Sequence, residues 1–235
     1  MSLPDLSSTP RTALHRHRER ARTERDDLYA VLDAGLICHL GVIADGVPRV
    51  LPTGYGRLGD TLYLHGSSAN ATFMAGGGQP VCVTVTHLDG LVCARSVFNH
   101  SMNYRSAMVF GVARLVTEPA EQLLALRTIT EHLAPGQWSY ARQPTKKELA
   151  ATSALALPLT EASVKIRAGG PSDEPEDYEL DIWAGVVPVT TGFGAPEPDA
   201  VLGPGIEAPP HIIKRGELSR VGSCRLAGHA QQARP

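Results

Sequence analysis

Hydrophobic and polar residues follow two different periods along this chain. Between residues 36 and 117, apolar positions come in short runs that are rich in β-branched side chains, which is typical of β-strands. The predicted strands are 36–43, 47–55, 61–66, 80–88, 91–98 and 105–117. The dipeptides Asp45-Gly46 and Asp89-Gly90 favour tight hairpin turns between such runs. Strands that follow one another this closely predict an antiparallel arrangement.

Helical spacing of apolar positions occurs before and after this strand region. Residues 23–35 form a compact amphipathic pattern, and Gly35 is a typical residue at which a helix ends. Thr23, with Asp26 three residues later, resembles a capping box at the start of that helix. The remaining predicted elements are helices over 118–133 and 145–155 and strands over 157–167 and 180–189.

The order of these elements predicts a mainly β fold, an antiparallel barrel with flanking helices. At 235 residues the chain is long enough to bury one sizeable core. Residues 1–22, with Pro, Ser and many Arg, predict a solvated N-terminal arm, and 23–198 the folded domain. Residues 199–235, which begin within the Gly- and Pro-rich stretch 191–210, predict an extended or disordered tail.

Composition and charge exclude several classes of function. A formal net charge of -2 gives no sign of binding to nucleic acid or to an anionic membrane. No apolar run approaches the ~20 residues of a membrane helix, and the N-terminus lacks the apolar core of a signal peptide. The widely spaced cysteines predict buried thiols in a reducing cytoplasm, at Cys38, Cys82, Cys93 and Cys224. We therefore expect a cytoplasmic protein with no nucleic-acid or membrane partner.

Two familiar signatures are rejected on their context. The letters GYGRLG match G-x-G-x-x-G at Gly54, Gly56 and Gly59, but they lie between two predicted strands and open no helix, so we reject a dinucleotide-binding loop. The histidines and cysteines near the strands match no set of metal-ligand spacings, so no metal site is predicted.

The segment 62–73, LYLHGSSANATF, is the first that carries candidate chemistry. A predicted strand ends at His65 and Gly66. Ser67 and Ser68 then offer hydroxyl donors, and a helix that begins after Ser67 presents free N–H groups, a combination that suits a phosphate. A serine in front of a helix is also the usual N-cap, so the residues alone leave both interpretations open.

The segment 99–111, NHSMNYRSAMVFG, is the second. Its polar side chains, which come directly before an apolar strand, are Asn99, His100, Ser101, Asn103, Arg105 and Ser106. Such side chains are costly to bury without partners. The guanidinium of Arg105 matches the geometry of a phosphate, with Ser106 as a neighbouring donor. The alternative is a surface hairpin loop with one ion-paired arginine.

In this order and spacing, these segments resemble the FMN-binding split-barrel proteins similar to pyridoxamine 5'-phosphate oxidase. The matching stretches are 32–70, 81–111 and 163–189. The likeness runs from about Thr23 to Pro198 and is closest to the bacterial branch near the nitroimidazole-resistance flavoproteins. The motifs are specific as an ensemble.

This resemblance implies a six-stranded Greek-key split barrel that forms a homodimer, with FMN in a cleft between the subunits. Pro52 and Thr53 are expected along the flavin ring, and the segment 65–68 around the phosphate. Trp183 is expected either to stack near the ring or to be a plain core or dimer-interface residue. The cofactor-binding residues implied are Pro52, Thr53, His65, Gly66, Ser67, Ser68, Asn70, Asn103, Tyr104, Arg105, Ser106, Lys165 and Trp183.

The chain departs from the family pattern at Ala71, where relatives usually carry Arg or Lys. A phosphate without that cation loses a charge-assisted hydrogen bond, about 1.5–3 kcal/mol. Arg105, Lys165 and Arg167 are the candidates to replace it.

The resemblance implies an FMN-dependent oxidoreductase that passes hydride or electrons between FMN and a small organic substrate. No side chain is singled out as catalytic, although histidine is the residue type suited to acid–base chemistry at neutral pH, and His65 and His100 are the candidates near the proposed site. Oxidation of pyridoxamine 5'-phosphate itself is not expected, because no Arg-rich substrate segment is found in DIWAGVVPV. The alternatives are a nitro-compound reductase, a non-catalytic flavin-binding protein, and a haem-binding protein with a histidine axial ligand.

Overall fold

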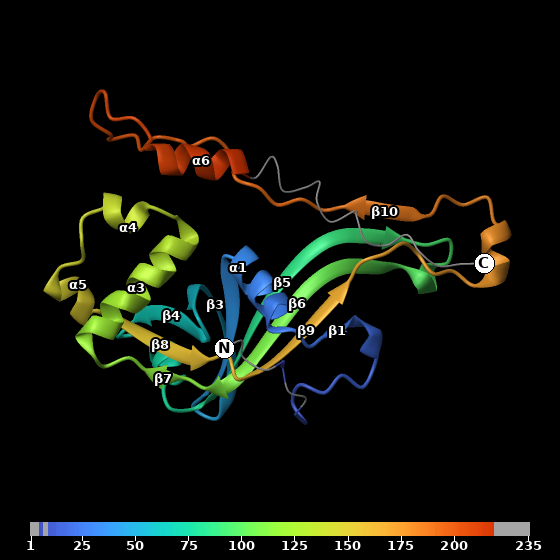
Figure 1. Ribbon diagram of the computed structural model, residues 1–235, viewed down its shortest axis with the longest axis horizontal. Coiled ribbons are helices and arrows are strands. Elements are labelled where there is room, and N and C mark those ends of the chain that lie inside the picture. The colour runs from blue at the N-terminus through green and yellow to red at the C-terminus, as the bar shows by residue number, and fades with distance from the viewer. Residues whose placement is uncertain (1–4, 7–8, 219–235) are drawn as a thin grey trace. The chain divides into compact units, whose positions relative to one another are not determined.

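The computed structural model describes residues 5–6 and 9–218, and Figure 1 shows the arrangement of the elements. The helical elements are η1 (Arg18–Arg20), α1 (Arg25–Ala34), α2 (Ala71–Met74), η2 (Val97–Asn99), α3 (Pro119–Leu133), α4 (Gln137–Tyr140), α5 (Lys146–Ala150), η3 (Pro175–Glu179) and α6 (Pro210–Leu218). The strands are β1 (Ala21–Arg22), β2 (Ile37–Ala44), β3 (Val47–Leu58), β4 (Thr61–Ser67), β5 (Pro80–Cys93), β6 (Ser101–Val112), β7 (Arg114–Leu115), β8 (Thr152–Pro158), β9 (Glu161–Arg167) and β10 (Gly185–Pro188).

The strands of the described residues form one antiparallel sheet, which confirms the mainly β prediction with flanking helices. The sheet has 10 strands in the order β1-β9-β6-β5-β2-β3-β4-β8-β7, and β10 pairs with β5. The six-stranded count implied by the family resemblance is therefore wrong, because ten strands, among them the short strands β1, β7 and β10, share one sheet. The hydrogen-bonded path is open at both ends.

The two predicted hairpin turns have different outcomes. Asp45 and Gly46 have φ values of 54° and 74° and connect β2 to β3, as expected of a tight turn. The turn expected at Asp89-Gly90 is wrong, because β5 runs straight through it and Gly90 lies opposite Pro188 of β10. A Cβ at Gly90 would lie 3.0 Å from Cγ1 of Val186, so the glycine allows β10 to approach closely.

Helix α1 and helix α3 form where the apolar spacing predicted them. Thr23, however, does not cap α1: the N-cap is Glu24, and no side chain closes that helix end. The helix expected over 145–155 ends at Ala150, and strand β8 begins at Thr152.

Helix α3 packs across β3, β4 and β8 (Figure 1). A Cβ at Gly56 would lie 2.7 Å from the backbone of Thr128, so this glycine of the rejected G-x-G-x-x-G match allows β3 to lie directly against α3.

In the part of the chain described, no helix is long and apolar enough to cross a bilayer.

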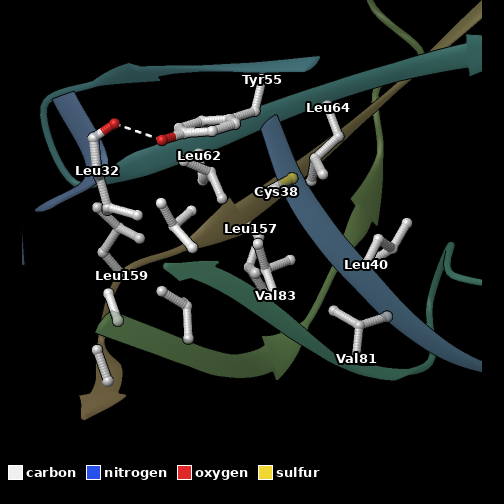
Figure 2. Close-up of a cluster of buried hydrophobic side chains, with 14 of the residues drawn as sticks. Leu32, Cys38, Leu40, Tyr55, Leu62, Leu64, Val81, Val83, Leu157 and Leu159 are labelled. Atoms are coloured by element: carbon white, nitrogen blue, oxygen red, sulfur yellow. Dashed lines mark hydrogen bonds between the residues drawn. The ribbon is translucent and has the colours of Figure 1, made fainter. Parts of the chain in front are cut away.

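Two compact units divide the chain, one of 1–88 with 104–167 and the other of 89–103 with 168–235, so β5 and β6 each contribute to both. The first unit contains the main hydrophobic core. Figure 2 shows Tyr55 inside it, where its hydroxyl donates a hydrogen bond to the carbonyl of Leu32.

Cys38 is buried in the same core, and burial raises the pKa of its thiol to about 12. Cys82 and Cys93 are free and partly buried, and Cys224 lies outside the described residues.

Part of the N-terminal arm packs on the rest of the first unit, while residues 15–19 are exposed, as expected of a solvated arm. Leu6 and Thr12 are buried, the side chain of Thr9 donates to Glu161 at 2.5 Å, and β1 pairs with β9. In the second unit, β10 pairs with residues 90–93 of β5. Residues 210–218 of the predicted tail form α6, and residues 219–235 lie outside the described part.

Candidate functional site

Strands β3 and β4 bring together the first group of predicted site residues. Thr53 on β3 reaches β4, where its hydroxyl lies 3.4 Å from the carbonyl oxygen of His65. Pro52 pairs with His39 of β2 and is exposed. Because successive residues of a strand point to opposite faces, Pro52 and Thr53 do not present their side chains to the same face. A ligand that lies along one face of β3 therefore contacts the side chain of either Pro52 or Thr53, and only the backbone of the other residue.

His65 is the titratable group of this region. Its Nδ1 is buried and has no hydrogen-bond partner. Burial lowers the pKa of His65 below its ordinary value, so the imidazole is neutral at pH 7. A neutral ring with an unsatisfied buried nitrogen is suited to positioning a ligand and not to holding a negative charge.

The loop after His65 differs from the expected phosphate cradle in two respects. The helix begins at Ala71 and not after Ser67, and Asn70 caps it by accepting a hydrogen bond from Phe73 N at 3.1 Å. The expectation of free helical N–H groups directly after Ser67 is therefore wrong. Gly66 is required by packing, because a Cβ there would lie 2.7 Å from Cγ of Phe73.

Ser67 and Ser68 nevertheless remain at the surface, where both are exposed. The Ser67 hydroxyl accepts from Ala69 N at 3.2 Å, and the Ser68 hydroxyl donates to Ala150 O at 3.4 Å. Each hydroxyl thus keeps hydrogen-bonding capacity for a ligand.

Arg49 supplies a cation at this loop that the sequence pattern did not indicate. Its Nη1 donates to the hydroxyl of Thr72 at 2.9 Å, directly beside Ala71, and its Nη2 lies 3.3 Å from Asp45 Oδ2. The Arg49 side chain is 45% exposed and therefore accessible to an anion. No local pattern links Arg49 to Ala71, because only the β2–β3 hairpin and the packing of α2 bring them together.

The second group of predicted residues lies on the β6–β9 ladder, separated from β4 by β5, β2 and β3 in the sheet order. Tyr104 lies opposite Arg167, and Ser106 opposite Lys165, so these four share one face. Arg105 lies opposite Ile166 on the other face. Burial, together with repulsion from Arg20, lowers the pKa of Arg167.

Asn103 and Trp183 belong to the second unit. Asn103 Nδ2 donates to Gly169 O at 3.0 Å. Trp183 is 68% exposed, so the interpretation as a plain core tryptophan is wrong. No group of three or more His, Cys, Asp or Glu that is able to hold a metal ion is found among residues 5–6 and 9–218.

Comparison with known proteins agrees with this fold. The family model described as pyridoxamine 5'-phosphate oxidase matches residues 24–166. The flavocytochrome Anf3 from Azotobacter vinelandii is 41% identical and superimposes with a TM-score of 0.84, over 88% of this chain and 97% of that one. The FAD- and heme-binding protein from Mycobacterium smegmatis is 38% identical, with a TM-score of 0.80 over 84% of this chain and 97% of that one.

A more distant structure shares the fold alone. This candidate 5-nitroimidazole antibiotic resistance protein from Bacteroides thetaiotaomicron is 20% identical, with a TM-score of 0.54 over 62% of this chain and 86% of that one. No curated protein matches the sequence. The family match covers more than half of the chain, and the resemblance found in the sequence is confirmed: the chain belongs to the pyridoxamine 5'-phosphate oxidase family.

Proposed function

We propose that this protein binds a flavin nucleotide and acts as a flavin-dependent oxidoreductase on a small organic substrate. The observation that carries the proposal is the position of Arg49, which places a guanidinium beside Ala71, where the family pattern has its phosphate-binding cation. Family membership and the exposed hydroxyls of Ser67 and Ser68 support the same site.

The residues of the first unit have distinct roles in this proposal. Arg49 and the serine hydroxyls bind the ribityl phosphate, since a guanidinium forms strong charge-assisted hydrogen bonds to phosphate. The backbone around Pro52 and Thr53 lies along the ring, and the neutral His65 positions the ligand. When bound, the flavin supplies the hydride or electron transfer, and the protein supplies binding, orientation and exclusion of water.

The experiment that tests the proposal is the absorbance spectrum of the purified protein before and after addition of FMN and desalting. The wild-type protein is expected to retain the flavin band. Arg49→Gln is expected to weaken flavin binding by about 10- to 100-fold, because one charge-assisted hydrogen bond contributes about 1.5–3 kcal/mol.

Arg142→Gln is the matched control, because Arg142 is also an exposed, ion-paired arginine, bound to Glu148. It is expected to leave flavin binding unchanged. Equal flavin retention by wild type and Arg49→Gln would show that Arg49 is not the phosphate-binding cation.

FMN is the flavin that we expect, and FAD is the second candidate, since a relative with 38% identity is described as binding FAD. Both carry the phosphate next to the ribityl chain, so the site at Arg49 serves either. Chromatography of the flavin released by heat identifies which one the protein holds.

We also propose that the protein is a homodimer with the flavin at the subunit interface. The outward face of β2 and β3 carries Ile37, Ile43 and Val50, which are 59%, 59% and 66% exposed, and Pro52 shares this face. An apolar sheet face of this kind is typical of a surface that another protein covers. A second copy of the chain is the proposed occupant.

Haem is the second cofactor that we propose. Two relatives, 41% and 38% identical, are described as a flavocytochrome and as an FAD- and heme-binding protein. Their likeness covers 88% and 84% of the chain and so extends beyond residue 166, where the family match ends. A Soret band after addition of hemin tests this proposal.

Two alternative functions stay predictions, a nitro-compound reductase and a non-catalytic flavin-binding protein. Reduction of nitro compounds is tested by turnover of a reduced nicotinamide with a nitro acceptor. If no donor and acceptor pair gives turnover while flavin is retained, the function is that of a non-catalytic flavin-binding protein.

A further inference from the structure

The loop of residues 94–100, between β5 and β6, is held by a carboxylate from the segment that follows the family match. Asp173 Oδ1 accepts hydrogen bonds from Arg95 N at 2.9 Å and from Ser96 N at 3.3 Å, and its Oδ2 pairs with Arg95 Nη1 at 3.2 Å. The Asp173 side chain has no exposed surface. The conformation of this loop therefore depends on a residue beyond position 166.

His100 ends the loop with an oriented imidazole. Its Nδ1 lies 3.0 Å from the carbonyl oxygen of Ser96 and 3.4 Å from Ala94 N. The contact with Ser96 O needs a proton on Nδ1, whereas a hydrogen bond from Ala94 N would need the lone pair there, so the two exclude each other. The shorter contact favours the form with the proton on Nδ1. Nε2 then carries a free lone pair. Histidines that bind a metal typically donate their other N–H to a carbonyl or carboxylate in this way.

The loop exposes His100 and two apolar side chains, and it also holds two buried donors. Val97 and Phe98 are 87% and 93% exposed. Arg95 Nε and Asn99 Nδ2 are buried with no hydrogen-bond partner. Haem combines a flat apolar ring with two carboxylates, and the exposed side chains of Val97 and Phe98 fit the ring. Because the porphyrin supplies four nitrogen ligands, one histidine suffices on the protein side.

We propose that Nε2 of His100 is an axial ligand of haem iron, and that Asp173 is a positioning residue that fixes the loop and thereby the Ser96 carbonyl that orients the imidazole. This inference rests on the proposed haem binding. The bond forms from the Nε2 lone pair to iron, while Nδ1 keeps its proton for Ser96 O.

Two other histidines of the described residues are excluded by their contacts. His87 Nε2 lies 2.9 Å from Val31 O, and His132 Nε2 lies 2.6 Å from Gly35 O. Both use the nitrogen that a haem ligand needs, so they stabilise the packing of the first unit instead.

The test is a hemin titration of the full-length wild-type protein and of His100→Gly, His100→Gln and His15→Ala, followed by absorbance. Flavin retention is measured in the same samples as the check on folding. We expect a sharp Soret band for wild type and for His15→Ala, an exposed histidine of the N-terminal arm. Both His100 variants should bind hemin more weakly, on the order of 100-fold, and Asp173→Asn about 10-fold. Added imidazole should restore the Soret band of His100→Gly, which a purely structural role of His100 would not produce.

Three results separate the alternatives. Loss of the band in both His100 variants with rescue by imidazole supports the inference. A wild-type spectrum and affinity in His100→Gly overturn it and leave haem binding in place. Flavin retention without any Soret band in the wild type overturns haem binding and this inference together, and leaves the flavin proposal standing.

Discussion

At the scale of single residues, side chains in the first unit have roles that their neighbours in sequence do not explain. Gly66 follows a strand and precedes two serines, which suggests a loop made for a ligand, yet the space beside its Cα is occupied by the ring of Phe73. The side chain of His65 points to the face of β4 opposite to that of Gly66, and its Nδ1 is buried without a hydrogen-bond partner. Packing therefore requires the glycine, whereas the histidine leaves a buried nitrogen without a hydrogen-bond partner.

Replacing Gly66 by Ala is expected to destabilise the protein by about 1–3 kcal/mol, because the new methyl group overlaps the Phe73 ring. Urea denaturation measures the change in the free energy of unfolding. Gly194→Ala is the control, because a Cβ at Gly194 meets nothing within 4 Å. Unchanged stability of Gly66→Ala would mean that Phe73 moves aside freely.

His65 is expected to make stability depend on pH. Burial lowers its folded pKa below the ordinary value of 6.5, so between these two pKa values the unfolded chain binds more protons. Stability should be complete above about pH 6.5 and fall as the pH decreases through this window. The measurement is urea denaturation from pH 5 to 8. In His65→Gln, the free energy of unfolding should depend less steeply on pH in this window. An unchanged pH dependence would show that another group is responsible.

At the scale of elements, strand β5 illustrates how pairing overrides a local turn signal. Asp45-Gly46 and Asp89-Gly90 are the same dipeptide between apolar runs, but only the first turns. The second is held extended by β10, whose residues come almost a hundred positions later. The chain reverses instead in the loop 94–100, where Asp173 binds two backbone N–H groups.

Asp173→Asn is expected to loosen this loop, because the amide loses the charge-assisted hydrogen bonds to Arg95. Amide hydrogen exchange at Arg95 and Ser96 should become faster, while exchange within β2 stays slow. Protection equal to wild type at both positions would show that the loop holds itself without the carboxylate.

The same contact predicts a pH effect of known sign. Desolvation raises the pKa of Asp173, but the hydrogen bonds from Arg95 N and Ser96 N and from the Arg95 side chain outweigh it, and the pKa is lowered overall. The protection of the Arg95 and Ser96 amides from hydrogen exchange should be complete above about pH 4, the ordinary range of an aspartate. It should be lost as the pH falls through the lowered pKa of Asp173.

At the scale of the whole molecule, the exposed apolar residues of β2 and β3 predict association. Val50→Asp places a charge in the middle of the proposed interface and is expected to convert a dimer into a monomer. Light scattering coupled to size-exclusion chromatography measures the mass. Val201→Asp is the control, since Val201 is 86% exposed in the second unit. A dimer that persists in Val50→Asp would place the interface on another surface.

The sequence by itself determined the strand-rich region, helices α1 and α3, the turn at Asp45-Gly46 and the family. These rest on local periodicity or on motif order, and both can be read without knowing which segments meet. The same motifs pointed to Thr53 and His65, which the structure brings together.

Only the tertiary structure decided which residues meet across long distances in the chain. Arg49 reaches Thr72, and Asp173 organises the loop before His100, because hairpins and strand pairing bring their backbones together. The extension of β5 through Asp89-Gly90 and the start of α2 at Ala71 have the same cause, since pairing and packing outweigh the small energies of local turn and capping signals.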